Sequence, residues 1–432
     1  MSSLAQPLVA CHHCGSILTR PELARGETAC CDRCGSVLWR YSSLSVNHWL
    51  ALVVTAFIVF VVANAYPVAL MSVQGLTQTA TLLDAVIITW QQSHEVVAVM
   101  TGLAGFVFPL AQLSLLLWVL VPLTFDREPP GFKVAMRILG VVRPWCMVPV
   151  FLLGVVVSVV KLAGMARIEP GTGLFAFGLL TVLLTMMSRL PPFALWRYAE
   201  RKKVVETHVP VPDDTEVLAG CHVCGQVQAL PAEASAEALH HCVRCDAVVH
   251  LRKPDHRART WALLIAAIVF YFPANMLPVM QIQSVFGTTQ HTILGGVIEL
   301  WTMGSWDIAT IVFVASVVVP LFKLLSMMAL LVGGHQQPPE KLRTRTRLYE
   351  VVELIGQWSM LDVFVVILLA ALANFHGLMQ ISAGGGAAAF GVVVIFTMLA
   401  AMSFDLRRSW DEAADDDGSS ETKANRRSAV PV

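Results

Sequence analysis

The stretch LALVVTAFIVFVVANAYPV occupies residues 50–68, and a second stretch, ALLIAAIVFYFPANMLPV, occupies residues 262–279. Each is an apolar run that ends in the same short motif, ANxxPV. A run of about 20 apolar residues is long enough to cross the hydrocarbon core of a bilayer as a helix. The two stretches therefore predict a membrane protein that contains one structural unit twice.

The composition of the whole chain agrees with a membrane location. Of the 432 residues, 56% are hydrophobic and only 14% are charged, which is more apolar surface than a soluble fold can bury. The 30 basic and 30 acidic residues cancel, so the chain lacks the positive charge that a nucleic-acid-binding protein uses. We therefore expect membrane lipids, and no nucleic acid, as partners.

Hydropathy predicts eight transmembrane helices, four in each unit. They are expected near 49–68, 96–123, 145–166 and 174–196 in the first unit, and near 261–280, 308–332, 360–374 and 387–404 in the second. Lys and Arg residues cluster before the first span, in alternate loops and after the last span, whereas the remaining loops carry only Arg167. Because basic residues resist translocation, we expect a multi-pass protein of the bacterial inner membrane with both termini in the cytoplasm.

Eight of the ten cysteines form two matched sets of paired CxxC motifs. The first set is Cys11, Cys14, Cys31 and Cys34, and the second is Cys221, Cys224, Cys242 and Cys245. Each CxxC turn aims two thiolates at one point, and two such turns close a tetrahedral shell of four sulfurs. We expect two structural zinc sites, with iron or redox-active thiols as the alternatives in a reducing cytoplasm.

These signals divide the chain into five parts. We expect a zinc-ribbon-like knuckle at 1–45, four helices at 46–200, a second knuckle at 201–258, four helices at 259–408 and a disordered cytoplasmic tail at 409–432. The predicted fold class is an all-α polytopic membrane protein, with two tandem four-helix repeats and two small cytoplasmic zinc-ribbon-like domains. Because each repeat has an even number of spans, a pseudo-two-fold axis along the membrane normal should relate the repeats.

Two lysines, Lys161 and Lys323, lie inside predicted spans. A charge at that depth costs at least about 2.5 kcal/mol unless it faces a polar interior. Pro320 frees the backbone carbonyl of Ser316 near Lys323, and the residue that matches Lys323 in the first repeat is Gln112, which is also polar. A polar network is one interpretation, and snorkelling of the ammonium to the membrane surface is the other.

A further apolar segment follows the first span of each repeat, at Thr81–Trp90 and Thr292–Trp301. Its apolar residues recur at helical spacing, which predicts a short helix on the periplasmic side. The helix could lie in the membrane interface with the tryptophan as its anchor, or it could pack into the core.

The chain resembles the paraquat-inducible protein A (PqiA/LetA) family of inner-membrane proteins over its whole length. The resemblance rests on the duplicated CxxC pairs and on ANMLPV at 274–279, TILGGVIELW at 292–301, IVFVASVVVPLFK at 311–323 and IGQWSMLDVFVV at 355–366. It implies a role beside periplasmic mammalian-cell-entry (MCE) domain proteins, which carry lipids, here expected to be phospholipids, between the inner and outer membranes.

The same resemblance implies a central polar cluster, which maps onto Lys161, Lys323 and Thr397. Asp362 is a candidate partner for Lys323, although the first repeat departs from the pattern by placing Pro149 at the corresponding position.

No sequence pattern indicates catalysis, so we do not expect an enzyme. The spans contain no recognisable set of acid, base and nucleophile, and the chain has no Walker A motif or dinucleotide fingerprint. Two alternatives to lipid transport stay open at this point. One is a membrane redox or stress-response protein that uses its CxxC sites, and the other is a scaffold that anchors a periplasmic partner without transporting anything.

Overall fold

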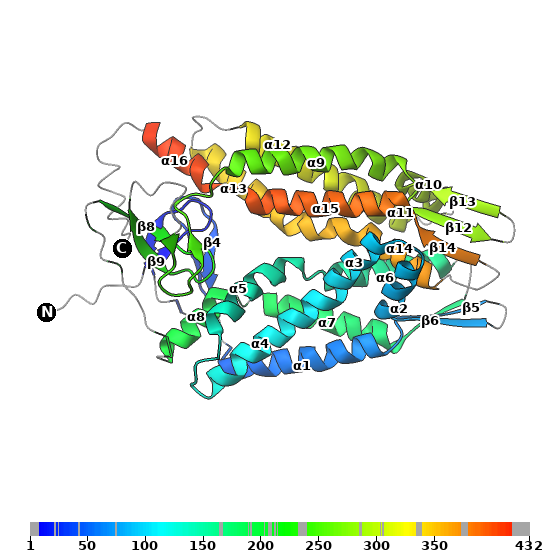
Figure 1. The fold of residues 1–432 in the computed structure, drawn as a ribbon, viewed down its shortest axis with the longest axis horizontal. Helices are drawn as coiled ribbons and strands as arrows, with labels where there is room; N and C mark the ends of the chain where they lie inside the picture. Colours follow the sequence, from blue (N-terminus) through cyan, green and yellow to red (C-terminus); the bar gives the residue numbers. More distant parts are fainter. Residues whose placement is uncertain are drawn as a thin grey trace.

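An elongated bundle of helices carries two cysteine knuckles at one end and two small β-sheets at the other (Figure 1). We call these the knuckle end and the sheet end. The arrangement comes from a computed structural model, which describes residues 8–20, 23–24, 26–41, 44–73, 76–163, 167–188, 190, 192–202, 204–205, 210, 213, 215–231, 240–284, 287–302, 304, 306–333, 339–372 and 379–416.

Corresponding helices follow one another in the same order in the two repeats. The first repeat contains α1 (Val46–Ala65), α2 (Leu82–Gln91), α3 (Glu95–Gly102), η1 (Leu103–Val107), α4 (Phe108–Thr124), α5 (Phe132–Val142), η2 (Arg143–Trp145), α6 (Val148–Ala163), α7 (Thr172–Ser188) and α8 (Pro192–Arg201). The second contains α9 (His256–Met276), α10 (Ile293–Thr302), α11 (Trp306–Phe313), η3 (Val314–Val318), α12 (Val319–Val332), α13 (Pro339–Ile355), η4 (Gly356–Met360), α14 (Leu361–Leu372), α15 (Gly385–Ser403) and α16 (Arg407–Asp416).

Six helical segments among the described residues are long and apolar enough to cross a membrane. They are Val46–Ala65, Glu95–Thr124, Phe132–Val159, His256–Met276, Ala309–Val332 and Gly385–Asp411. The fourth predicted span is α7, which forms a pair with α8 across a 63° bend. The seventh is α14, whose 12 residues are short for a span, and residues 373–378 that follow it lie outside the described part. The described residues thus contain six helical segments that could span a membrane, or seven with the bent pair, and the predicted count of eight is not confirmed.

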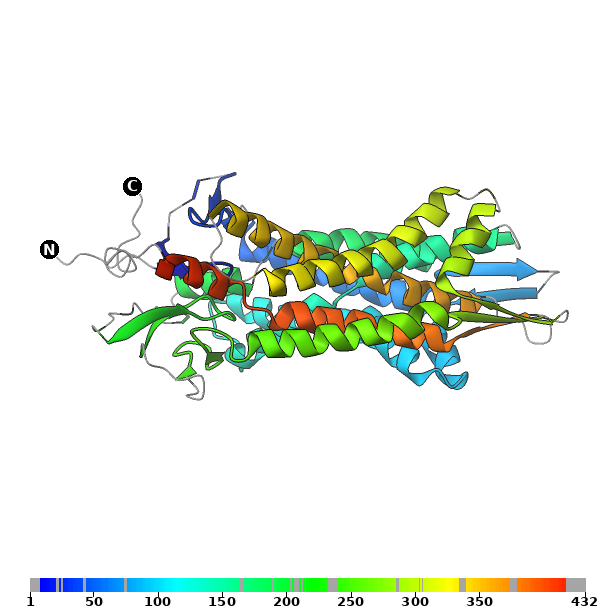
Figure 2. The same ribbon diagram turned by 90° about the horizontal axis from the view of Figure 1, so that it is seen from above.

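The two repeats lie side by side along the bundle, the first in blue to green and the second in green to red (Figures 1 and 2). Their central contact is between α6 and α14. Phe151 and Phe364 are matched residues on these helices, and their rings meet edge to face with centroids 5.5 Å apart. Residues related by a two-fold axis touch each other only close to that axis. The contact therefore marks the position of the pseudo-two-fold axis between the repeats.

Each repeat contains a π-helical turn at the matched place. These turns are η1, directly before α4, and η3, directly before α12. Pro109 and Pro320 lie in the first turns of the helices that follow. Because proline cannot donate a hydrogen bond to the carbonyl one turn earlier, the helix accommodates it with a locally wider turn. The duplicated proline thus explains the duplicated irregularity.

Two three-stranded antiparallel sheets form the sheet end, and the hydropathy analysis did not predict them. The first sheet has the order β6 (Leu76–Ala80), β5 (Ala69–Val73), β7 (Arg167–Pro170), and the second has the order β13 (Gly287–His291), β12 (Met280–Ser284), β14 (Met379–Ala383). In each sheet the middle strand directly follows the first span of its repeat, and one edge strand comes after the third. The sheets therefore join the ends of α1 and α6, and of α9 and α14.

The repeated ANxxPV motif connects each first span to its sheet. The Pro67 carbonyl accepts a hydrogen bond from the Gly173 amide at 3.0 Å, and the Pro278 carbonyl accepts one from the Gly386 amide at 3.0 Å. A Cβ atom at Gly171 would lie only 2.1 Å from the Pro67 oxygen, and the corresponding distance at Gly384 is 2.0 Å to the Pro278 oxygen. The close approach of the two backbones at this corner therefore requires glycine.

The short helices predicted after the first spans are present as α2 and α10. A capping box starts α2, because the Thr81 hydroxyl accepts from the Asp84 amide and the Asp84 carboxylate accepts from the Thr81 amide. Trp90 and Trp301 are 51% and 60% exposed, so the tryptophans do not pack into the core. Location of these helices in a membrane interface stays a prediction.

Candidate functional site

Each cysteine knuckle consists of two short β-hairpins whose turns carry the CxxC motifs. The first knuckle contains β1 (Leu8–Ala10), β2 (Ile17–Thr19), β3 (Thr28–Cys30) and β4 (Val37–Arg40). The second contains β8 (Glu216–Gly220), β9 (Val227–Pro231), β10 (His240–His241) and β11 (Val248–Val249). In both knuckles the cysteines of the two turns are buried and face one another.

The sulfur positions fit a tetrahedral metal shell. In the first knuckle the Sγ atoms of Cys11 and Cys34 are 3.6 Å apart, and those of Cys14 and Cys31 are 3.5 Å apart. The second knuckle repeats these distances, with 3.6 Å for Cys221 and Cys245 and 3.5 Å for Cys224 and Cys242. A metal held by four sulfurs at about 2.3 Å has sulfur–sulfur edges of about 3.8 Å. All eight cysteines are free thiols, so each knuckle can hold one metal ion.

The backbone of each turn explains why these residues form the shell. The amide of Gly15 donates to the Cys11 carbonyl at 2.9 Å, which closes the turn, and Gly15 has φ +76°. At the fourth turn Asp246 takes the place of glycine and still adopts φ +58°. Hydrogen bonds from neighbouring thiols, first from Cys14, hold the pKa of Cys11 well below its usual range. The same contacts raise the pKa of Cys14 and Cys31, so these two thiols must release their protons when a metal binds.

A matched arginine anchors each knuckle to a tryptophan on a helix. In the first knuckle Arg33 donates from Nη2 to the Trp410 carbonyl at 2.8 Å, with its Cζ 5.3 Å from the ring centroid. In the second knuckle Arg244 donates to the Trp196 carbonyl at 3.1 Å, with its Cζ 4.5 Å from the ring. Hydrogen bonding and cation–π contact thus act together at both anchors. Each anchoring helix, α8 or α16, lies at the end of a repeat.

The two anchors tie the second knuckle to the last helix of the first repeat and the first knuckle to the last helix of the second repeat, so the chain closes as a ring. The second knuckle contacts α8 directly before it, whereas the first knuckle contacts α16 at the far end of the chain. Arg343 on α13 also holds the first knuckle on the second repeat, because it donates to the carbonyls of Asp32 and Arg33, at 3.1 Å each. The first knuckle also contacts α8, through Arg20 with Glu200 and through Trp39 with Arg197, and the predicted division of the chain into five parts stays a prediction.

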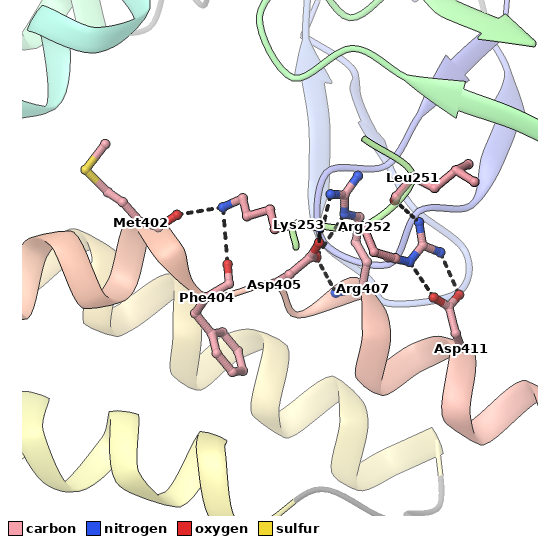
Figure 3. A network of polar contacts seen from close by, with 8 residues as sticks. All are labelled: Leu251, Arg252, Lys253, Met402, Phe404, Asp405, Arg407 and Asp411. Atoms are coloured by element: carbon pink, nitrogen blue, oxygen red, sulfur yellow. Dashed lines mark hydrogen bonds and ion pairs between the residues drawn. The ribbon is translucent and has the colours of Figure 1, made fainter. Parts of the chain in front are cut away.

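A network of charges also fixes the second knuckle to the end of α15 and to α16 (Figure 3). Arg252 makes a two-pronged ion pair with Asp411. Asp405 accepts from the Lys253 amide at 2.9 Å and from Arg407 Nη2 at 2.9 Å. Helix α16 therefore contacts both knuckles. Residues up to Asp416 are helical, which differs from the disordered tail expected from 409 onward, because Trp410 and Asp411 find partners on the knuckles.

We expect Trp410→Ala to loosen the first knuckle while leaving the second intact. Trp410 is buried, and truncation of a buried tryptophan costs about 3–5 kcal/mol. A chelator added to the purified protein should then remove one metal ion faster than from the wild-type chain and the other at the wild-type rate. Trp118→Ala, at an exposed position, is the control. Equal release of both ions from the Trp410 variant would contradict the ring-like arrangement.

Inside the bundle, Lys323 is the most unusual of the predicted site residues. It lies on α12 and is only 2% exposed. Its Nζ atom has no hydrogen-bond partner within the part of the chain that the structure describes. A Cβ atom at Gly356 would lie 3.4 Å from Nζ, so the side chain ends beside the 3-10 turn η4. This neighbour was not predicted, although it belongs to the motif IGQWSMLDVFVV.

The structure brings the other predicted polar residues into the bundle without joining them to Lys323 by described hydrogen bonds. Gln112, Ser316 and Thr397 are buried. The hydroxyls of Ser316 and Thr397 donate to carbonyls of their own helices, at 2.6 and 2.9 Å. Gln112 Oε1 has no partner among the described residues. The side chains of Lys161 and Asp362 lie outside the described part, so their predicted contribution is not tested.

Comparison with known proteins identifies the fold family. The family model described as paraquat-inducible protein A matches residues 46–200 and 258–414. The chain belongs to the paraquat-inducible protein A family. The two matched segments cover both helical repeats of this family, including α8 and α16 with their anchoring tryptophans. No solved structure matches the chain significantly.

Curated relatives of this family member include proteins named as intermembrane transport proteins. It is 32% identical over 416 residues to the intermembrane transport protein PqiA of Escherichia coli K12, covering 93% of this chain and 95% of the relative. It is 29% identical over 403 residues to the lipophilic envelope-spanning tunnel protein A of the same strain, covering 93% and 90%. A probable intermembrane transport protein of Haemophilus influenzae is 27% identical over 411 residues, covering 93% and 95%. The chain is therefore a multi-pass membrane protein related to intermembrane transport proteins.

The anchoring arginines are the functional residues that sequence reasoning missed. Arg33 and Arg244 occupy the same place in the second CxxC motif of each knuckle, in CDRC and CVRC. The repeated arginine at this place could have been recognised from the sequence as a functional signal. The identity of the partner was not detectable, because Arg33 and Trp410 are separated by 377 positions in the chain.

Proposed function

We propose that this protein is the inner-membrane component of a system that moves phospholipids between the inner and outer membranes. A periplasmic MCE-domain protein is its proposed partner, and both termini and both knuckles are proposed to lie in the cytoplasm. The names of the relatives support intermembrane transport in general. The lipid, the partner and the orientation are our extension from the family resemblance and from the distribution of basic residues.

The observation that carries this proposal is the buried ammonium of Lys323, which has no hydrogen-bond partner among the described residues. A cation at such a depth costs at least about 2.5 kcal/mol unless a polar or anionic group compensates it. The matched position in the first repeat, Gln112, also presents a buried oxygen without a described partner. A phospholipid headgroup offers the anionic and polar atoms that both side chains lack. We infer that the headgroup passes Lys323 during transport.

Zinc is the metal that we propose for the two knuckles. Four thiolates in a closed tetrahedral shell are the usual ligands of structural zinc, and the measured sulfur distances fit such a shell. When bound, the metal would cross-link the two hairpins of each knuckle. The surrounding residues Arg33 and Arg244 would then hold the cross-linked knuckles on α16 and α8. Nothing in this role requires catalysis, and we propose that the protein is not an enzyme.

Co-purification followed by lipid mass spectrometry tests the proposed function. The tagged full-length chain, isolated from a native membrane, should bring down an MCE-domain protein together with phospholipid. A lipid-transfer assay with the reconstituted pair should move labelled phospholipid between two vesicle populations, whereas either protein alone should not. Recovery of a stable complex that transfers no lipid would favour the scaffold alternative.

The proposed orientation predicts which positions can be labelled from the periplasm. Single cysteines at Gln78 and Gln290 should react with a membrane-impermeant maleimide in intact spheroplasts. The labelling of the chain without an introduced cysteine gives the background from its native cysteines. Cysteines at Pro130 and Glu216 should react only after the membrane is opened. The first pair lies at the sheet end and the second toward the knuckle end. The reverse pattern would overturn the orientation but not the fold.

A further inference from the structure

A small basic cavity lies where the two knuckles meet α8, outside the polar site in the membrane. It measures ≈ 60 Å³, about the space of two water molecules in the liquid. Its lining includes Arg20 of the first knuckle, Arg197 of α8 and Arg244 of the second knuckle. Glu200 is the one carboxylate among the described lining residues. Three guanidinium groups from three separate elements thus line a cavity that also contains Glu200 and Cys224, a cysteine of the second shell.

The hydrogen bonds leave part of this positive charge without a partner. Glu200 pairs with Arg244 at 2.7 Å and with Arg20 at 3.6 Å. Arg244 is 8% exposed, and its Nε has no hydrogen-bond partner among the described residues. The Arg197 guanidinium lies between two aromatic rings, with its Cζ 4.9 Å from the centroids of both Trp39 and Phe193. The stacking fixes the plane of the group, and no described carboxylate pairs with it.

A second cavity lies beside α16, between the two knuckles. It is lined by Arg252, Lys253, Arg407 and Asp405. Each of these cations has an acceptor, as Figure 3 shows: Arg252 has Asp411, Arg407 has Asp405, and Lys253 has the Met402 carbonyl at 2.6 Å. Each of these three cations therefore has a described hydrogen-bond acceptor, in contrast to Arg197 of the first cavity.

The chain segments around the two anchoring tryptophans differ at two matched positions. The residue after the tryptophan is Asp411 in the second repeat and Arg197 in the first. The residue five positions before it is Asp405 in the second repeat and Pro191 in the first. The carboxylates that pair with Arg252 and Arg407 beside α16 thus have no counterpart around Trp196, and Arg197 stands in the place of one of them.

We propose that the cavity between Arg20, Arg197 and Arg244 binds a phosphate group. Guanidinium groups recognise phosphate oxygens through paired charge-assisted hydrogen bonds, and the volume of the cavity suits one such group. The phosphate belongs either to a membrane phospholipid or to a small soluble phosphate. A lipid source fits the position of the cavity, because it lies beside α8, which directly follows the apolar helix α7. This inference does not rest on the proposed transport function.

Equilibrium dialysis with radiolabelled inorganic phosphate tests the site on the purified full-length chain in detergent. At constant ionic strength set with chloride, we expect saturable binding at one site per chain. Arg197→Gln should weaken binding at least tenfold, and Arg20→Gln should do the same from the opposite wall. Arg201→Gln is the matched control, because Arg201 is exposed on the same helix and does not line the cavity. Unchanged metal content serves as the check on folding for each variant.

A second arm distinguishes a lipid from a soluble phosphate. Wild-type and Arg197→Gln chains are placed in nanodiscs that contain phosphatidylglycerol in phosphatidylcholine, and the retained lipid is measured by native mass spectrometry. Retention of phosphatidylglycerol by the wild type and its loss in the variant would support the site with a lipid headgroup as its source. If neither inorganic phosphate nor lipid distinguishes Arg197→Gln from the wild type, the proposal is wrong, and the arginines only offset the charge of the thiolate shells.

Discussion

Cys221→Ser is expected to remove one metal ion from the protein and to lower its abundance in the membrane severalfold. The four sulfurs of the second knuckle lie within 4.8 Å of one another, and a serine oxygen cannot replace the lost thiolate in such a shell. The energy of metal binding in a small knuckle is folding energy, because the hairpins bury little apolar surface of their own. A loss of a few kcal/mol is enough to change abundance through proteolysis.

The contacts of the second knuckle predict which region of the chain Cys221→Ser should destabilise. The second knuckle is anchored to Trp196 on α8 through Arg244, so the region that becomes sensitive to protease should be the end of the first repeat. Element analysis of the purified protein and limited proteolysis would measure both effects. Cys30→Ser is the control, because Cys30 lies in the first knuckle outside the shell and is exposed. Two zinc ions and normal abundance in Cys221→Ser would refute the metal site, and coloured iron in the wild type would revive the redox alternative.

Much of the fold follows from patterns that lie within one repeat. The CxxC turns could be predicted because each one needs only two cysteines and a residue that tolerates positive φ, and these are adjacent in the sequence. The expectation of a pseudo-two-fold axis between the repeats follows similarly from the duplicated spans. Lys323 was identified because a basic residue deep in an apolar run stands out regardless of its surroundings.

The features that were missed depend on contacts between distant segments. Strands β5 and β6 have five residues each, which is too short for a clear alternating pattern beside a long apolar helix. Strand β7 pairs with β5 across most of the first repeat, so no local signal joins them. Helix α14 looked like an ordinary span in hydropathy, but it packs between the two repeats against α6 and α2. Its apolar residues therefore match a protein interior as well as they match lipid.

For the candidate site, as for the fold, the sequence predicted local features but not contacts between distant segments. Sequence reasoning could select Gln112, Ser316, Lys323 and Thr397 as polar residues within apolar segments, and all four are buried. It could not show that the Lys323 ammonium ends beside Gly356, because this contact depends on how α12 packs against η4. The small size of glycine leaves the space that the lysine occupies.

Lys323→Ala is expected to abolish phospholipid transport while leaving folding, metal content and partner binding normal. The side chain has no described hydrogen bond to lose, so its removal should not destabilise the chain, and it removes an expensive buried charge. A loss of transport without a loss of stability would therefore separate a functional role from a structural one. Lys341→Ala, at an exposed lysine on α13, is the control for removal of a positive charge.

Lys323→Gln distinguishes the need for charge from the need for a polar group. Glutamine is the residue that the first repeat has at the matched position, Gln112, so the bundle already accommodates it in that environment. If the ammonium attracts the headgroup, the glutamine variant should fail like the alanine variant in a cell that depends on this pathway. If polarity is sufficient, it should retain activity and the alanine variant should not. Full complementation by both variants, with no phospholipid captured by a photo-crosslinker at the neighbouring buried Leu324, would overturn the proposed role of Lys323 and favour a scaffold.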